Sequence, residues 1–400
     1  MGGSSTSAPK ADPTPVRFGI SLSHHDLARA LRSDAGSDGA AAGATRAATE
    51  RLVALGRAAE DGGSSTVWVS EDPDGWDAFA ILTLVATATD RIGLATAVTS
   101  PLLRHPNQIA ASLSTLDLIS RGRAALGIGR GEPDWYRNGL GQAVPDHPLD
   151  GLARAVELIR AWLVSPHRVT NPSPSPDDPF PVRDWERTIS PWPGRTTPPR
   201  IVIAAAGPRA LALAGRIADG VMFNDLASDE YLGWAITVVR DAARAAGRDP
   251  RTISFTYNSA VLVTDDPGPE LRSRQLMLAL VNALPGMDRQ LYGAGHDIPA
   301  LIADIRHALG SDTIHTSGGG FPAIRRTGKL RAAADLVPLD LVRRLAIVGD
   351  RDHVRTRLAT LSALGIDEVM VRLPAPGDPA RDLTSRLLDL RSLAPTDNVG

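Results

Sequence analysis

The chain has 400 residues, of which 43% are hydrophobic and 22% are charged, as is typical of a globular protein with a large core. Its formal net charge of −2 gives no indication of nucleic acid or a membrane surface as a partner. Cysteine is absent, which excludes disulfides, cysteine nucleophiles and thiolate metal sites. No apolar run could span a bilayer, and residues 1–15 are small and polar. We therefore expect a disordered N-terminal tail over 1–15 and a cytoplasmic protein.

Short β-rich runs alternate with longer helical patterns along the rest of the chain. The expected elements are, in chain order, a strand at 16–23, a helix at 45–61, a strand at 66–71, a helix at 77–90, a strand at 92–100, a helix at 105–120, a strand at 123–131, a helix at 150–163, a strand at 200–206, a helix at 208–218, a strand at 220–224, a helix at 229–247, a strand at 253–264, a helix from 350, a strand at 367–373 and a terminal helix. The pattern predicts one domain over residues 16–395.

Two segments interrupt this alternation. Residues 165–199 are so rich in proline that no regular element is expected there, and we interpret them as an insertion over one rim of the domain. Residues 265–345 form a variable insertion region with two or more helices. We expect these two segments and the loop after the first strand to determine the substrate.

Eight strands with helices between them predict a single (β/α)8 barrel with insertions at its C-terminal face, and an open doubly wound sheet is the alternative. In such a barrel the chemistry lies at the carboxyl ends of the strands. The side chains to consider there are therefore those that end each predicted strand.

The fourth strand, in "ALGIGRGEPDWY" (125–136), carries glycine at every second position. Gly127, Gly129 and Gly131 would all face the same way, because successive side chains of a strand alternate between its faces. A dinucleotide fingerprint is disfavoured, because the spacing is G-x-G-x-G and Glu132 with a proline follows at once. Two interpretations stay open: the glycines accommodate a bulky neighbouring layer, or they leave room for a flat ligand with Glu132 at its edge.

A second candidate binding segment is "IAAAGPRALALAGRIADG" (203–220), where a strand ends in small residues and a helix begins. Backbone N–H groups at a helix N-terminus bind phosphate well, and small side chains allow its close approach. A tight turn without a ligand is the alternative interpretation.

Several acid–base candidates stand at predicted strand ends. His25 follows the first strand, and Glu71 with Asp72 follows the second. Each of them could equally be an ordinary solvated residue. The histidines show no metal-ligand spacing and no serine lies in a G-x-S-x-G elbow, so neither a metal site nor a hydrolase triad is predicted.

The order of these motifs resembles that of the bacterial-luciferase-like family, and within it the branch that uses the deazaflavin coenzyme F-420. The resemblance rests on "RIGLATAVTSPLLRHPNQIAASLSTLDLISRGRAALGIGRGEPDWY" (91–136), on 203–224 and on 347–373. It implies a (β/α)8 barrel with the flavin or deazaflavin in its mouth.

The resemblance also assigns roles to residues. Ala97 and Val98 match a bulge with a non-prolyl cis peptide that backs the ring system. Gly129, Arg130, Gly131 and Glu132 match the segment that lines the cofactor, and Ala204, Ala205, Ala206 and Gly207 match the segment that holds its phosphate. Asp72 stands where sugar-phosphate dehydrogenases of the family have a catalytic histidine, which puts that reaction in doubt. His25 is the candidate for the missing proton-transfer group, beside Glu71, Asp72 and Glu132.

The predicted function is hydride transfer between coenzyme F-420 and a small organic substrate. The alternatives are an FMN-dependent monooxygenase that uses O2, and a cofactor-binding barrel without catalysis. Dimers are common in the family, so a homodimer is compatible with the resemblance. Trp68, Trp76 and Trp135 are expected near the barrel mouth, where they would report cofactor binding by fluorescence.

Overall fold

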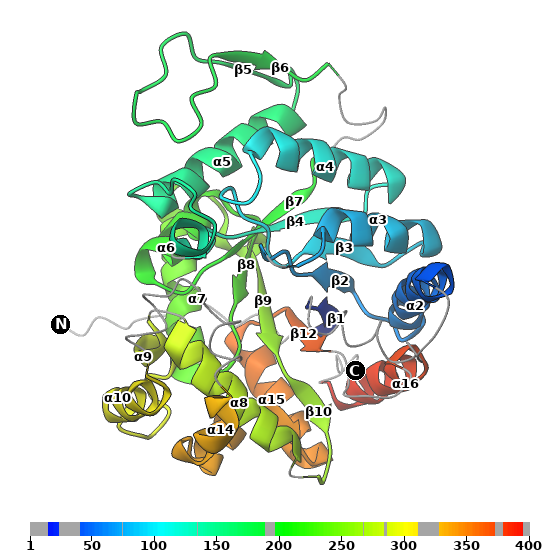
Figure 1. The fold of residues 1–400 in the computed structure, drawn as a ribbon, viewed down its shortest axis with the longest axis vertical. Helices are drawn as coiled ribbons and strands as arrows, with labels where there is room; N and C mark the ends of the chain where they lie inside the picture. Colours follow the sequence, from blue (N-terminus) through cyan, green and yellow to red (C-terminus); the bar gives the residue numbers. More distant parts are fainter. Residues whose placement is uncertain are drawn as a thin grey trace, which may run out of the picture.

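A closed barrel of eight parallel strands forms the centre of the molecule (Figure 1). This computed structural model describes residues 15–23, 41–73, 75–133, 135–188, 197–266, 268–283, 286–310, 328–372 and 379–394. Around the barrel the strand order is β1-β12-β9-β8-β7-β4-β3-β2. The strands are β1 (Arg17–Leu22), β2 (Thr66–Val69), β3 (Gly93–Thr96), β4 (Ala124–Ile128), β7 (Arg200–Ala204), β8 (Gly220–Phe223), β9 (Ser254–Ser259) and β12 (Glu368–Arg372). The predicted (β/α)8 barrel is confirmed, and the open doubly wound sheet is excluded.

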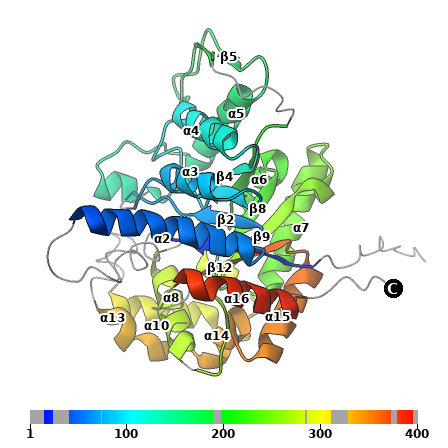
Figure 2. The same ribbon diagram turned by 90° about the vertical axis from the view of Figure 1, so that its right-hand side faces the viewer.

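Helices surround this barrel in the expected alternation (Figures 1 and 2). They are α2 (Ala41–Asp61), α3 (Ala78–Ala88), α4 (Pro106–Ile119), α5 (Pro148–Leu163), α6 (Pro208–Ile217), α7 (Asp229–Ala245), α15 (Arg351–Leu364) and α16 (Pro379–Leu393). Side chains of Asp77, Ser228 and Asp350 accept backbone N–H groups at the starts of α3, α7 and α15, which fixes where these helices begin. Across the described ranges, every helix is too short or too polar to cross a membrane.

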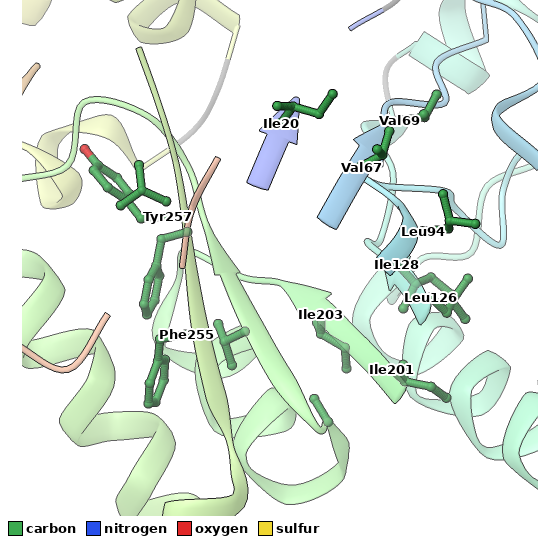
Figure 3. Packing of buried hydrophobic residues seen from close by; sticks show 14 of the residues in the cluster. Ile20, Val67, Val69, Leu94, Leu126, Ile128, Ile201, Ile203, Phe255 and Tyr257 are labelled. Carbon is green, nitrogen blue, oxygen red and sulfur yellow. The ribbon is translucent and has the colours of Figure 1, made fainter. Parts of the chain in front are cut away.

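Side chains of the barrel strands alternate strictly between two environments. Outward residues such as Val67, Leu126 and Ile203 pack against the helices (Figure 3). Inward residues such as Trp68 and Met222 fill the barrel interior together with small alanines. This period of two is what allows both faces of a parallel strand to be buried.

A polar cluster closes the amino-terminal end of the barrel interior. The buried carboxylate of Glu368 accepts hydrogen bonds from Ser65, from Trp68 Nε1 at 3.2 Å and from Thr256 at 3.4 Å. Burial raises the pKa of Glu368 even though the hydrogen bonds from Ser65 and Trp68 lower it. Trp68 is therefore held deep in the barrel, and the expectation that it lies near the mouth is wrong.

The Pro-rich segment contains regular structure, contrary to the expectation from its composition. Strands β5 (Arg168–Thr170) and β6 (Asp184–Glu186) form a small antiparallel sheet. Arg168 forms ion pairs with Asp184 and Glu186 on the facing strand. Five of the segment's ten prolines lie in the loop between the two strands, at positions 172, 174, 176, 179 and 181. The segment packs on α4 and α5, where Phe180 contacts His105 and Arg154 pairs with Asp178.

The 265–345 region forms a helical cluster with its own hydrophobic core. Its described elements are α8 (Gly268–Ala283), α9 (Met287–Gln290), α10 (Ile298–Leu309), α13 (Lys329–Ala332) and α14 (Leu339–Leu345). The strand predicted at 253–264 divides at Ala260, because β10 (Val261–Val263) leaves the barrel to pair with β11 (Ile347–Gly349). This cluster and the β5–β6 hairpin lie at opposite ends of the molecule's longest axis (Figures 1 and 2).

Arg123 ties three elements together at the start of β4. Its guanidinium donates five hydrogen bonds, to Ser120 O, Ile92 O, Ala86 O, and both Thr89 O and Thr89 Oγ1. We expect Arg123→Met to lower the free energy of unfolding by about 2–4 kcal/mol, because it leaves partly buried carbonyls unpaired. Arg121→Met is the matched control, since the Arg121 side chain is 85% exposed. Equal denaturant midpoints for the two variants would contradict this role.

Glu60 accepts hydrogen bonds from three consecutive backbone N–H groups, those of Asp90, Arg91 and Ile92. Burial raises the pKa of Glu60, but these hydrogen bonds and the charge of Arg91 outweigh it and lower the pKa overall. The stabilisation is therefore present above the unfolded-state pKa and is lost as the pH falls through the lower folded-state value. We expect Glu60→Gln to destabilise the protein at neutral pH, and the difference from wild type to shrink as acid protonates Glu60. Denaturant unfolding across this pH range measures it, and a pH-independent difference would contradict the account.

Candidate active site

A cavity of about 710 Å³ opens at the carboxyl ends of the barrel strands. The structure brings every predicted site residue except His25 to its wall, and His25 lies outside the described residues. These lining residues are Glu71, Asp72, Ala97, Val98, Gly129, Arg130, Gly131, Glu132, Ala204, Ala205, Ala206 and Gly207. The volume is in the range of ordinary cofactor and substrate sites.

A bulge at the end of β3 shapes one wall of this cavity. Ala95 pairs with Ala125, but the next pairing joins Thr99 to Ile128, so β3 carries one extra residue. The Ala97–Val98 peptide within this bulge is cis, as the resemblance implied. Thr96 fixes the bulge from the side, because its hydroxyl donates to Gly127 O at 2.6 Å and accepts from Gly127 N at 3.1 Å.

The structure shows why glycine occupies three positions in and after β4. A Cβ at Gly127 would lie 1.9 Å from Thr96 O, so this glycine accommodates the neighbouring backbone and not a ligand. At Gly129 a Cβ would meet Val98 at 3.0 Å, and Gly129 also lines the cavity. Gly131 has a φ of +75°, a conformation that favours glycine. A Cβ at Gly131 would also lie 2.5 Å from Ser100 Oγ. Close packing against neighbouring protein atoms therefore accounts for all three glycines, and room for a flat ligand beside Gly129 and Gly131 stays a prediction.

The carboxyl end of β2 carries a buried acid. Arg104 donates to Glu71 Oε1 from Nε at 3.0 Å and from Nη2 at 2.6 Å, and it also pairs with Asp77 at 2.8 Å. Burial raises the pKa of Asp77, but its hydrogen bonds from Arg104 and Ala80 and the charge of Arg104 lower it overall. Asp72, the next residue, also faces the cavity.

Tyr136 also lines the cavity, within reach of the charges of Asp72 and Glu71. It belongs to a π-helix, Trp135–Gly139, and hydrogen-bonds with Ser100. Burial raises the pKa of Tyr136 to about 12, so the hydroxyl stays protonated at neutral pH. Nearby, Arg130 lies 3.4 Å from Glu132.

The N-terminus of α6 forms another part of the wall. Gly207 occupies the N-cap, Pro208 follows, and no side chain caps this end of the helix. A Cβ at Gly207 would meet nothing within 4 Å, so the space in front of the helix is open. Small residues from Ala204 lead into it. An uncapped helix start with open space in front is suited to an anion.

Several lining residues were not found from the sequence. Asn258 is the second-to-last residue of β9, and Arg289 and Gln290 come from α9 in the 265–345 region. Of the Pro-rich segment, no described residue lines the cavity. Asn258 could have been predicted, because barrel sites lie at the carboxyl ends of strands. No sequence motif distinguishes Arg289 or Gln290, which only the tertiary fold brings to the cavity.

Only one of the three expected tryptophan reporters lines the cavity. Trp135 does so, whereas Trp76 is 46% exposed and is not part of the wall, and Trp68 is in the barrel interior. Fluorescence changes on ligand binding should therefore come mainly from Trp135.

The glycine analysis gives a paired prediction. We expect Gly127→Ala to lower the free energy of unfolding by about 3 kcal/mol or more, because the new methyl group overlaps Thr96 O. Gly207→Ala should change it by less than about 0.5 kcal/mol, because its φ of −84° and its open surroundings accept a methyl group. Urea unfolding of both variants measures this. Equal stability of the two would contradict the packing described for β3 and β4.

Comparisons with known proteins agree with this architecture. The family model described as luciferase-like monooxygenase matches residues 26–368. A putative coenzyme F420-dependent oxidoreductase of Mycobacterium tuberculosis is 28% identical over 337 residues, which are 82% of this chain and 92% of that protein. The 5,10-methylenetetrahydromethanopterin reductase of Methanolobus tindarius is 25% identical over 81% of this chain and 90% of its own length.

Solved structures show the same fold. The coenzyme F420 dependent tetrahydromethanopterin reductase from Methanopyrus kandleri superposes with a TM-score of 0.70 at 22% identity, covering 94% of this chain and 99% of that one. The monooxygenase RslO1 from Streptomyces bottropensis gives a TM-score of 0.60 at 21% identity, covering 94% and 97%. The family match spans most of the sequence and the described barrel has the same architecture as these structures, so the chain belongs to the luciferase-like monooxygenase family of enzymes.

Proposed function

We propose that the protein is an oxidoreductase that transfers a hydride between coenzyme F-420 and a small organic substrate. One observation carries the proposal: a single cavity joins the β3 bulge, the glycine-rich end of β4 and the uncapped N-terminus of α6. Relatives that align with 82%, 54% and 60% of the chain are named as F420-dependent, which favours the deazaflavin over FMN.

The residues present fit such a coenzyme. The cavity offers a long wall from the β3 bulge to α6, with more apolar than polar surface, as a flat ring system requires. The open space before Gly207 suits a phosphate group. Ala97 and Val98 would support the ring, Ala204–Gly207 would hold the phosphate, and Arg130 and Glu132 would contact the polar edge of the ring.

When bound, a deazaflavin supplies two-electron hydride transfer and reacts poorly with O2. The chain's own residues position the reactants and manage the accompanying proton. Tyr136 is a protonated donor at neutral pH, and Asp72 and Glu132 are the carboxylates that could accept a proton at the wall. His25 stays a candidate from the sequence alone. Because the resemblance places Asp72 where sugar-phosphate dehydrogenases have a catalytic histidine, we do not propose a sugar-phosphate substrate.

The cytoplasmic location and the homodimer stay predictions made from the sequence.

Titration of the protein with coenzyme F-420 and, separately, with FMN tests the proposal, with Trp135 fluorescence as the main reporter. We expect saturable binding of F-420 and much weaker binding of FMN. Tighter binding of FMN, with oxygen consumption, would favour the monooxygenase instead. Binding of neither would contradict both functions.

A charge at the α6 N-terminus should separate cofactor binding from folding. We expect Gly207→Glu to weaken F-420 binding at least about tenfold, because the carboxylate would repel the phosphate at the helix N-terminus. Gly207→Gln, of similar size but neutral, should weaken it less. Unchanged affinity in Gly207→Glu would show that the phosphate lies elsewhere.

A further inference from the structure

Two asparagine side chains lie next to each other on the cavity wall. Asn258 belongs to β9, and Asn224 directly follows the neighbouring strand β8. Each comes one residue after a member of the pair Phe223 and Tyr257, so the two asparagines are in register on strands about 4.8 Å apart. Phe223 and Tyr257 pack outward against the helices. Because strand side chains alternate between faces, both asparagines point into the barrel.

Neither side-chain amide forms a hydrogen bond with a described residue. Of their four polar atoms only Asn258 Oδ1 is fully buried, so Asn258 Nδ2 and both polar atoms of Asn224 keep accessible surface. Both side chains are half-buried and line the cavity, which is where this surface lies. Polar groups in such surroundings normally have partners. The pair therefore offers hydrogen-bond donors and an acceptor to a ligand.

Hydrogen bonds behind the two asparagines fix their backbone. Ala227 N donates to Tyr257 Oη at 3.2 Å, which ties the segment after Asn224 to β9. One residue later, Ser228 N donates to Gln290 O at 2.9 Å and so holds α9 against the same segment. Gln290 adds a third carboxamide to the cavity wall. This part of the wall is thus held in place before any ligand binds.

The two amides are neutral, and the charges nearest to them along the chain are engaged elsewhere. Asp225, which follows Asn224, is fully buried and pairs with Arg372 at 3.0 Å. Arg289 of α9 also lines the cavity, but its guanidinium lies over the ring of Trp234, 5.8 Å from the ring centroid. A charged ligand group at the amides would lose hydration without gaining an ion pair. An uncharged polar group fits this part of the wall best.

We propose that Asn224 and Asn258 bind an uncharged substrate group with a donor and an acceptor side by side, as in a carboxamide or a lactam. This inference rests on the proposed function and extends it to the substrate class. Around the closed barrel, three strands separate β9 from β3 in either direction, so Asn258 lies across the cavity from the β3 bulge. A coenzyme ring supported by Ala97 and Val98 leaves its other face toward Asn258, and the substrate lies there.

A purely structural role explains the pair less well. An asparagine that stabilises the fold hydrogen-bonds with its neighbours, as Asn107 does when its Oδ1 accepts from Arg187 at 3.1 Å. A leucine at position 258 would have a similar shape and leave no polar atom unpaired. Two amides without partners on the cavity wall therefore add nothing to stability in the free protein, and ligand binding accounts for them.

Three probes of nearly identical shape test the proposal: isobutyramide, 3-methylbutan-2-one and isobutyrate, in which the same carbonyl group carries an amino group, a methyl group or a negative oxygen. Ligand-observed NMR measures the affinity of each for the free protein and for protein saturated with F-420. We expect isobutyramide to bind best and the ketone at least about threefold more weakly, because it has no donor. Isobutyrate should bind at least about tenfold more weakly than isobutyramide, because its charge finds no partner.

A pair of variants separates binding from stability. In Asn258→Leu the preference for isobutyramide should disappear, while the midpoint of thermal unfolding stays the same or rises, because an unpaired amide is removed. Asn107→Leu is the matched control, because it removes an amide that has a partner and lies outside the cavity wall. It should lower the midpoint and retain the preference.

Equal affinities of the three probes for the wild type, tighter binding of isobutyrate, or no binding of isobutyramide would overturn the proposal whether or not any variant folds. A preference that persists in Asn258→Leu, or a midpoint that falls as far as in Asn107→Leu, would also overturn it. Displacement of isobutyramide by F-420 would assign the amides to the coenzyme and not to the substrate. The F-420 titration is read separately through Trp135, so failure of the proposed function is distinguishable from failure of this inference.

Discussion

The contact between Thr96 and Gly127 determines the shape of the whole site. One extra residue in β3 pushes the Thr96 carbonyl oxygen into the space that a side chain at position 127 would occupy. Only glycine permits this approach, and the Thr96 hydroxyl then bonds both backbone groups of Gly127. As a result the Ala97–Val98 peptide projects toward the cavity, between the acids of β2 and the glycine-rich end of β4. The regular barrel beneath, with its alternating inward and outward side chains, holds this irregular segment in place.

The two ends of the cavity wall differ in charge. At β2 the wall carries the carboxylates of Glu71 and Asp72, and Arg104 pairs with both Glu71 and Asp77. At α6 the helix N-terminus is uncapped, and Arg209 lines the cavity beside it. The uncapped helix N-terminus with Arg209 beside it favours an anionic group of the coenzyme at α6.

Much of this could be predicted from the sequence because periodicity and strand ends are local signals. The eight barrel strands and the helices between them were expected near their observed positions. The lining residues of β2, β4 and β7 follow from the rule that barrel sites lie at carboxyl strand ends, whereas Ala97 and Val98 followed only from the family resemblance. The predictions that were wrong concern features that depend on tertiary contacts. The high proline content argued against the β5–β6 hairpin, in which Arg168 pairs across the strands with Asp184 and Glu186. The depth of Trp68 depends on Glu368, which is far away in sequence. Arg104 and Gln290 carry no local motif, and only the fold brings them to the site.

A crystal structure of the protein with coenzyme F-420 would test the central claim most directly. We predict that the ring lies against Ala97 and Val98 and that the phosphate lies at the N-terminus of α6 near Gly207. A coenzyme bound with its phosphate away from α6, or with its ring outside the β3 bulge, would contradict the account.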